Sequence, residues 1–187
     1  MFDFIKQLAL MPKETGAVSP SSKSLSEFIV KQANVTKAKA IVELGPGTGV
    51  FTAKIMKNKA KDAKFFALEI NPFFVSKTKK ICPAATVYRA PAEDISVYLK
   101  KHGLKKCDCI VSGLPWANFN ITKQNKIISE AVRVLEDDGT FATFAYLHGA
   151  FLPSGQRFAR MLSNSFSSVK RTKTVWKNLP PCVCLRL

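Results

Sequence analysis

The sequence predicts an α/β fold, in which a mostly parallel sheet of seven strands carries helices on both faces and closes with an antiparallel hairpin. Short apolar runs alternate with amphipathic stretches, as in a chain of β/α units. The runs are apolar on both faces, which is typical of strands covered from both sides. The last two runs follow each other without a helix between them, which predicts the hairpin.

The N-terminal 34 residues are predicted to form a segment of two helices joined by a loop over residues 15–22. Residues 1–11 place Asp3, Lys6 and Gln7 on one stripe of an amphipathic helix that Pro12 ends. Ser21 or Ser22 can cap a second helix that runs to about residue 33. The apolar side of the first helix is wide, so this helix fits a membrane anchor or a cover over the sheet or over a cleft.

Residues 35–187 are predicted to form the core, and with the helical segment they make one domain, because no repeat or long linker divides the 187 residues. We expect strands over residues 40–44, 65–69, 86–90, 107–112, 140–147, 169–177 and 182–187. We expect helices between them over residues 50–59, 72–81, 93–101, 122–135 and 156–163.

The charge balance predicts an anionic partner. Lys and Arg number 29 against 13 Asp and Glu, which leaves a net charge of +16. Most of these cations are lysines, which favour a phosphate-rich surface over the reading of DNA bases, although a basic face can also serve solubility alone. With no apolar stretch of ~20 residues and no cleavable signal, the sequence predicts a cytoplasmic protein. The wide apolar side of residues 1–11, together with the lysine-dominated charge, predicts that it attaches to anionic membranes peripherally.

The five cysteines are predicted to be reduced core residues. Cys107 and Cys109 form one Cys-x-Cys pair, and Cys182 and Cys184 form another, both in apolar runs. This spacing is shorter than that of structural zinc sites, so we expect no metal. Alternation along a strand predicts that the two members of each pair face the same side of the sheet.

The segment AIVELGPGTGVFT, residues 40–52, predicts a ligand site. A strand breaks there into the spacing Gly45-x-Gly47-x-Gly49 and then opens a helix, whose N-terminus offers unpaired N–H groups. Glu69 follows Gly49 by twenty residues and ends the next strand, where a carboxylate can accept both hydroxyls of a ribose. The combination predicts a nucleoside-containing cofactor.

This glycine spacing departs from the dinucleotide fingerprint, which would have its third glycine at Val50. It resembles motif I of class I S-adenosylmethionine-dependent methyltransferases. The resemblance implies S-adenosylmethionine as cofactor, with the ribose at Glu69 and the adenine against Ile70. It also implies that the methionine part of the cofactor lies along Glu43, Gly45, Pro46, Gly47 and Gly49.

One feature of that family is missing after the third strand, where an Asp usually receives the adenine amino group. Here the position is Pro91. Ala92 can still offer its backbone N–H, and Glu93 or Asp94 can replace the acceptor, although either acid can equally serve a helix N-terminus. Pro91 is also the feature that gives weight to a non-catalytic, cofactor-binding adaptor as an alternative.

The end of the fourth strand predicts the acceptor site, because open α/β sheets bind ligands at this edge. Its sequence resembles the (Asn/Asp/Ser)-x-x-Pro-aromatic motif of amine methyltransferases, in which carbonyls and a side chain hold the amine. The matching residues are Ser112, Gly113, Leu114, Pro115 and Trp116. Trp116 can alternatively be a core residue.

Two residues after the fifth strand, Tyr146 and His148, are further candidates to bind the acceptor or to buffer its proton. For His148, a surface loop position without such a role is the alternative. We expect His102 to serve only the basic surface.

Three segments, residues 15–25, the SGLPW motif and residues 174–187, together resemble the soluble bacterial phospholipid N-methyltransferases that act on phosphatidylethanolamine. The related ribosomal RNA adenine dimethyltransferases usually have Asn and Tyr where Ser112 and Trp116 stand, and they carry a further helical domain. The resemblance implies methylation of phosphatidylethanolamine at an anionic membrane. The alternatives are N6-methylation of ribosomal RNA adenine, methylation of a protein or small amine, and the adaptor.

Overall fold

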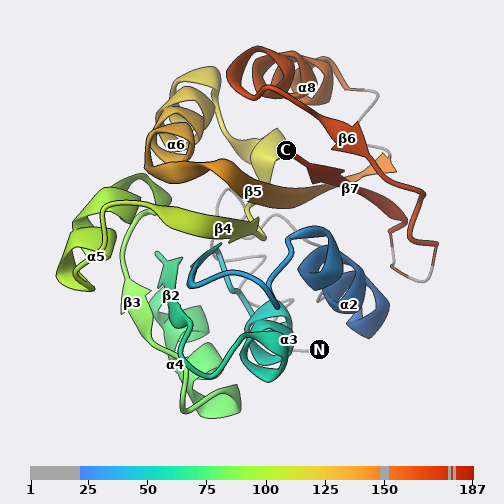
Figure 1. Cartoon of the computed structure of the whole chain (residues 1–187). Coiled ribbons are helices and arrows are strands. Elements are labelled where there is room, and N and C mark those ends of the chain that lie inside the picture. Colours follow the sequence, from blue (N-terminus) through green and yellow to red (C-terminus); the bar gives the residue numbers. More distant parts are fainter. Residues whose placement is uncertain (1–21, 148–151, 177, 179) are drawn as a thin grey trace.

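The sheet has seven strands in the order β3-β2-β1-β4-β5-β7-β6, which confirms the predicted fold class (Figure 1). Strands β1 to β5 pair in parallel, whereas β7 runs antiparallel to both β5 and β6. The computed structural model describes residues 22–147, 152–176, 178 and 180–187. The strands are β1 Ala40–Leu44, β2 Lys64–Glu69, β3 Val87–Arg89, β4 Cys107–Ser112, β5 Leu135–Tyr146, β6 Lys170–Arg171 and β7 Cys182–Arg186.

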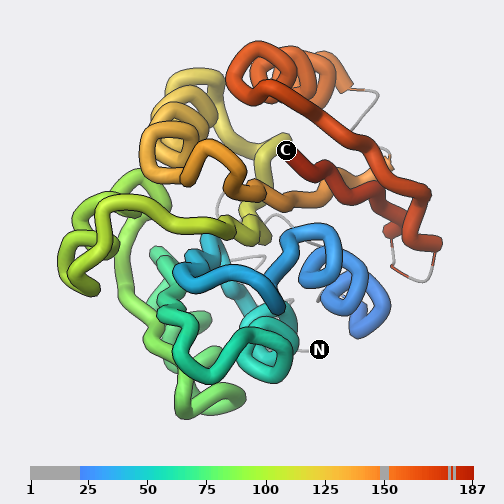
Figure 2. Tube along the Cα trace, viewed as in Figure 1, coloured from blue at the N-terminus to red at the C-terminus, as the bar shows by residue number. Residues whose placement is uncertain are grey.

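Helices cover both faces of the sheet, as Figure 2 shows along the chain trace. One core cluster contains residues of α2, α3 and α4, and the other contains residues of α5, α6 and α8. The helices are α2 Lys23–Gln32, α3 Val50–Asn58, α4 Pro72–Ile81, α5 Ile95–Lys101, α6 Ile121–Val134 and α8 Pro153–Ser165. Two 3₁₀ turns, η1 Ala92–Asp94 and η2 Trp116–Asn118, follow the carboxyl ends of β3 and β4.

The structure describes only part of the predicted N-terminal helical segment, from Ser22 onward. Ser22 caps α2, because its hydroxyl accepts the N–H of Leu25 at 3.1 Å. The Ser22 N–H donates to the side chain of Asn178 at 2.9 Å, which joins the start of α2 to the loop before β7. Ser21 and the amphipathic helix predicted over residues 1–11 lie outside the described residues.

The hairpin differs from its predicted form. β6 is two residues long and β7 lies between it and β5, so the edge strand of the sheet is β6. β5 begins at Leu135, earlier than predicted, because it pairs with Cys107 before the register shifts. The prediction missed this start because residues 136–138 are acidic and exposed.

The cysteines are buried strand or helix-end residues, but one pair does not face one side. Cys182 and Cys184 lie in the same core cluster, as alternation predicts. Cys107 and Cys109 lie in different clusters, because an irregularity in the β4–β5 pairing falls between them. Within the described part of the chain, no His, Cys, Asp and Glu side chains gather into a metal-binding group, and no helix could cross a bilayer.

His102 is part of the fold and not only of the basic surface, so that expectation was wrong. Its ring stacks on Phe66 with centroids 5.0 Å apart, and its Nε2 lies 3.1 Å from the hydroxyl of Tyr88. Partial burial, followed by the charges of Lys64 and Lys101, lowers the pKa of His102 below its ordinary value. The ring is therefore neutral at physiological pH.

Candidate functional site

A cavity of about 360 Å³ lies along the carboxyl edge of the sheet. Its lining runs from the loop after β3, past the turns after β1, β2 and β4, to β5, β7, β6 and the first turns of α8. The elements that line the cavity come from segments far apart in the sequence, from Gly45 to Leu185. The motifs predicted to bind cofactor and acceptor therefore share one space.

The glycine turn after β1 leaves room for a ligand. Gly47 lines the cavity with a φ of 56°, and a Cβ built on it would meet nothing within 4 Å. Its carbonyl accepts the hydroxyl of Thr78 at 2.9 Å, which fixes the turn against α4. Gly113 approaches the same turn closely, because a Cβ there would lie 2.6 Å from the carbonyl oxygen of Gly45.

Glu69 lies under this turn at the end of β2. The residue is 7% exposed, and its two carboxylate oxygens accept the N–H groups of Gly47 at 3.1 Å and of Asn71 at 3.0 Å. A carboxylate oxygen can accept more than one hydrogen bond, so Glu69 can hold the glycine turn and also receive a ligand hydroxyl.

The part of the cavity formed by the residues that follow β2 and β3 has the properties of an adenine site. Ile70 lines the cavity and is 41% exposed, although its side chain is apolar. Ala92 and Glu93 also line the cavity, whereas Asp94 does not. Oxygen Oε2 of Glu93 is buried and has no hydrogen-bond partner among the described residues. Since a buried acceptor is costly to leave unpaired, this geometry favours Glu93 over Asp94 as the replacement for the missing Asp.

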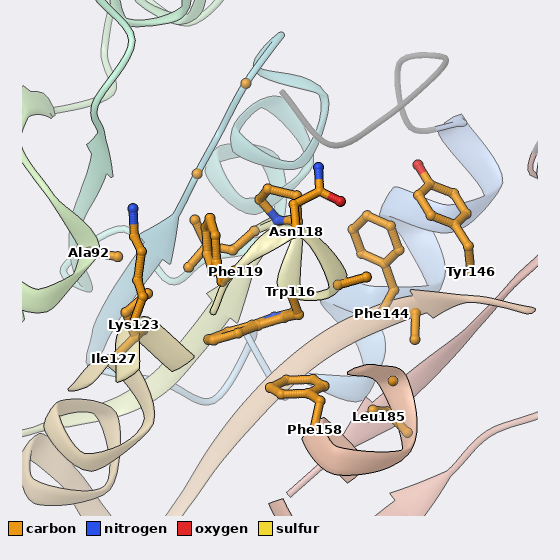
Figure 3. A pocket seen from close by; sticks show the side chains of 18 of the residues that line it. Ala92, Trp116, Asn118, Phe119, Lys123, Ile127, Phe144, Tyr146, Phe158 and Leu185 are labelled. Atoms are coloured by element: carbon orange, nitrogen blue, oxygen red, sulfur yellow. The ribbon is translucent and has the colours of Figure 1, made fainter. Parts of the chain in front are cut away.

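Trp116 both lines the cavity and belongs to the core. Its ring is 4% exposed and stacks on Phe158 of α8 with centroids 4.6 Å apart, as Figure 3 shows. Its Nε1 donates to Thr143 at 2.9 Å, and its carbonyl accepts the side chain of Gln124 at 2.7 Å. These contacts hold the ring in place as a wall of the cavity. Trp116 therefore lines the cavity and also packs in the core, the two roles that the sequence left open.

Besides Asp94, four predicted site residues lie outside the lining: Glu43, Pro46, Gly49 and Ser112. Ser112 is fully buried behind Gly113, and its Oγ accepts the N–H of Leu114 at 3.4 Å. Glu43 is also fully buried, and its Oε2 accepts the hydroxyl of Thr52 at 2.7 Å. Both side chains therefore support the turns that line the cavity, and do not line it themselves.

The buried carboxyl of Glu43 makes stability depend on pH. Burial, to which the charge of Glu69 adds, raises the pKa of Glu43 to about 8, although the bond from Thr52 opposes the shift. Between the ordinary value of 4.5 and about 8, the folded protein holds a proton that the unfolded chain has released. The free energy of unfolding should therefore fall as pH rises through this window.

Glu43→Gln should remove that dependence, because the amide is neutral and keeps an acceptor for Thr52. Between pH 5 and pH 8, the unfolding free energy of the parent should fall by roughly 2–4 kcal/mol more than that of the variant. Chemical denaturation at both pH values measures it. Parallel pH profiles of parent and variant would contradict a protonated Glu43.

Tyr146 lines the cavity at the end of β5, with its ring 5.4 Å from that of Phe144. Burial raises the pKa of Tyr146 to about 12, so the phenol keeps its proton at neutral pH. It can hydrogen-bond to an acceptor molecule, but it cannot buffer a proton there. His148 lies outside the described residues.

Several lining residues were not predicted from the sequence. Phe119 and Lys123 line the cavity (Figure 3). The Lys123 ammonium lies 4.6 Å from the centre of the Phe119 ring. A second group comes from α8, β6 and β7, and comprises Gly155, Gln156, Phe158, Ala159, Arg171, Val183 and Leu185. The Asn120 cap, which fixes the first turn of α6, was the one available signal for Lys123.

Comparison with known proteins agrees with this geometry. The family model of ribosomal RNA adenine dimethylase matches residues 21–111, which include β1 to β3 and most of β4. The O-methyltransferase of Bacillus cereus, solved in complex with SAH, has the same fold, with a TM-score of 0.68 at 12% identity over 100% of this chain and 89% of that one. The N-methyltransferase NodS of Bradyrhizobium japonicum WM9 gives 0.67 at 11% identity, over 88% and 93%.

The chain has the fold of class I S-adenosylmethionine-dependent methyltransferases, and these similarities indicate S-adenosylmethionine as the cofactor. One relative is the ornithine lipid N-methyltransferase of Singulisphaera acidiphila, 29% identical over 168 residues that cover 88% of this chain and 83% of the relative. It supports the resemblance to lipid N-methyltransferases that the sequence shows. The glycine turn, Glu69, the apolar face of Ile70 and the unpaired Glu93 oxygen all fit the cofactor of this class.

Proposed function

We propose that this methyltransferase transfers methyl groups to the primary amine of a membrane lipid, with phosphatidylethanolamine as the acceptor. The observation that carries the proposal is the shape of the acceptor half of the cavity. Beyond Trp116 its lining is mostly apolar and continues between α8 and the strands β5, β7 and β6. A small polar amine would leave such a wall uncovered, whereas a lipid brings apolar surface to it. The lipid N-methyltransferase relative supports the same class of acceptor.

The cofactor half would hold S-adenosylmethionine through its backbone and two acids. Gly45 and Gly47 would lie along the methionine part, and Glu69 would accept the ribose hydroxyls. Ile70 would cover the adenine, Ala92 would donate its N–H to the ring, and Glu93 would accept the amino group. Glu43 would act through Thr52 by fixing the turn.

When bound, S-adenosylmethionine supplies a methyl group on a positively charged sulfur. The backbone of Gly113 and Leu114 would hold the neutral amine, while Trp116 excludes water from it. The amine lone pair would form the N–C bond as the C–S bond breaks, and the product ammonium would release its proton to water. Tyr146 would hold the acceptor and not remove the proton, because its pKa is about 12.

The carboxyl edge has the properties of a surface that meets an anionic bilayer. Three large apolar side chains are exposed in the described part of this region. They are Ile121 at the start of α6 (48%), Leu152 at the cap of α8 (49%) and Trp176 before β7 (73%). Residues 139–187 contain seven Lys and Arg and no Asp or Glu. Exposed tryptophan and basic surfaces are both favourable at anionic head groups. Ser22, the first described residue, is hydrogen-bonded to Asn178 at this edge, and we propose residues 1–11 as a membrane anchor.

Trp176→Ser should weaken binding to vesicles rich in phosphatidylglycerol by roughly tenfold, since an apolar contact with the lipid is lost. Deletion of residues 1–11 should weaken binding further, and added salt should release the parent. Co-sedimentation measures all three. Val132→Ser is the matched control, because Val132 is 41% exposed but lies near the other end of α6. Equal binding of parent, Trp176→Ser and the deletion variant would contradict this surface.

The acceptor class is tested by offering labelled cofactor together with phosphatidylethanolamine vesicles, ornithine lipid vesicles or ribosomal RNA. We expect label in the phosphatidylethanolamine. Label in ornithine lipid alone would overturn phosphatidylethanolamine as the acceptor in favour of ornithine lipid, the substrate in the relative's name. Label in RNA alone would overturn the proposal in favour of the activity named by the family model that matches residues 21–111.

A further inference from the structure

Arg171 marks the far end of the cavity, opposite the cofactor half. It is an exposed residue of the edge strand β6 and lines the cavity together with Leu185 of β7 and residues of α8. Among the described residues, its guanidinium has neither an ion pair nor a hydrogen bond. The acids that line the cavity, Glu69 and Glu93, lie in the cofactor half.

Strand register places Arg171 in line with the acceptor motif. Ser112 pairs with Thr143, Thr143 pairs with Leu185, and Leu185 pairs with Arg171. Directly paired residues point to the same face of a sheet, so Arg171 lies on the face that α8 covers. Three strand spacings of about 4.8 Å put its backbone roughly 14 Å from that of Ser112. An arginine side chain on this face is long enough to extend toward the acceptor motif along the apolar lining that Leu185 contributes.

We propose that Arg171 is the subsite for the anionic group of the acceptor lipid, the phosphodiester of phosphatidylethanolamine. The inference rests on the proposed function, and it explains why a cation without an acidic partner lies in a mostly apolar half of the cavity. In phosphatidylethanolamine, the phosphodiester is a few bonds from the amine. A guanidinium that holds the phosphate in its planar fork would orient the amine toward Gly113 and Trp116.

The test uses a short-chain phosphatidylethanolamine, dihexanoyl, below its micelle concentration, so that attraction to a charged membrane plays no part. Arg171→Gln in the full chain should raise KM roughly 10- to 100-fold, the effect of losing one charge-assisted contact. The change in kcat should be small by comparison. Calorimetric titration of the same lipid should show the same loss of affinity, and the affinity for S-adenosylmethionine should be unchanged. Arg171→Lys should restore part of the loss, because it keeps the charge without the fork.

Lys170→Gln is the matched control. It removes one positive charge from the adjacent residue of β6, which alternation points to the opposite face and which does not line the cavity. Two further probes identify the anion: a dihexanoyl amine with a neutral carbamate in place of the phosphate, and an N-acyl ornithine with a carboxylate. Arg171→Gln should leave the use of the neutral probe unchanged.

The outcomes separate the subsite from the proposed function. If the parent methylates phosphatidylethanolamine and Arg171→Gln behaves like Lys170→Gln, the subsite is wrong while the function stands. An equal loss on the phosphate and the neutral probe would show a packing role and would also overturn it. An Arg171 effect on N-acyl ornithine but not on phosphatidylethanolamine would make the bound group a carboxylate and reject the phosphodiester. A parent that methylates none of the lipid amines would overturn the proposed function and the subsite with it.

Discussion

Glu69→Ala should weaken S-adenosylmethionine binding roughly 10- to 100-fold while the protein stays folded. The substitution removes the proposed acceptor of the ribose hydroxyls and also the partner of the Gly47 and Asn71 N–H groups. The glycine turn therefore loses its support together with the ligand contact. Calorimetric titration of the cofactor measures the effect.

Two variants separate the contributions of Glu69. Glu69→Gln keeps one acceptor oxygen and should lose less affinity than the alanine variant. Asp94→Ala removes an acid that does not line the cavity, so its cofactor affinity should equal that of the parent. A Glu69→Ala variant that binds the cofactor as tightly as the parent would show that Glu69 is not the ribose acceptor.

Trp116→Ala should reduce turnover by roughly 100-fold, far more than it reduces cofactor affinity, because the wall that orients the acceptor is lost. It should also cost about 3–5 kcal/mol of unfolding free energy, since the ring is buried against Phe158. Steady-state kinetics, together with chemical denaturation, measure the two effects.

Trp116→Phe keeps the protein folded and tests the site alone. The smaller ring still stacks on Phe158 but loses the bond from Nε1 to Thr143, which is worth about 1 kcal/mol. We expect turnover between that of the parent and that of the alanine variant. Normal turnover in both variants, with only stability lowered, would show that Trp116 is a core residue without a role at the acceptor.

The central strands could be predicted to the residue, because they are mostly apolar and almost completely buried. β1 and β4 agree in both bounds with the predicted runs, as does α4 after its Asn71 cap and Pro72. The end of the sheet was harder to predict. β6 is only two residues long, whereas the predicted strand spans residues 169–177. Its neighbour in the sheet depends on pairing between distant segments, which local patterns do not encode.

The cofactor half of the site could be predicted because it is built from short motifs, each at the end of one strand. In the acceptor half, the motif after β4 could be predicted in the same way, but the far wall could not, since Leu185 and Arg171 reach the cavity only through the register that joins β5, β7 and β6. Glu43 and Ser112 show the opposite case. They lie within motifs, but strands buried on both faces carry no signal for which side chains face the ligand.

The most direct test of the account is to find the atom that receives the methyl group. The full chain is incubated with S-adenosylmethionine carrying ¹³C in its methyl group and with phosphatidylethanolamine vesicles, and the extracted lipid is examined by ¹H–¹³C NMR and mass spectrometry. We expect one or more ¹³C-methyl groups bonded to the head-group nitrogen, and a much smaller yield from Trp116→Ala. A lipid without label, or a label on oxygen or carbon, would contradict it.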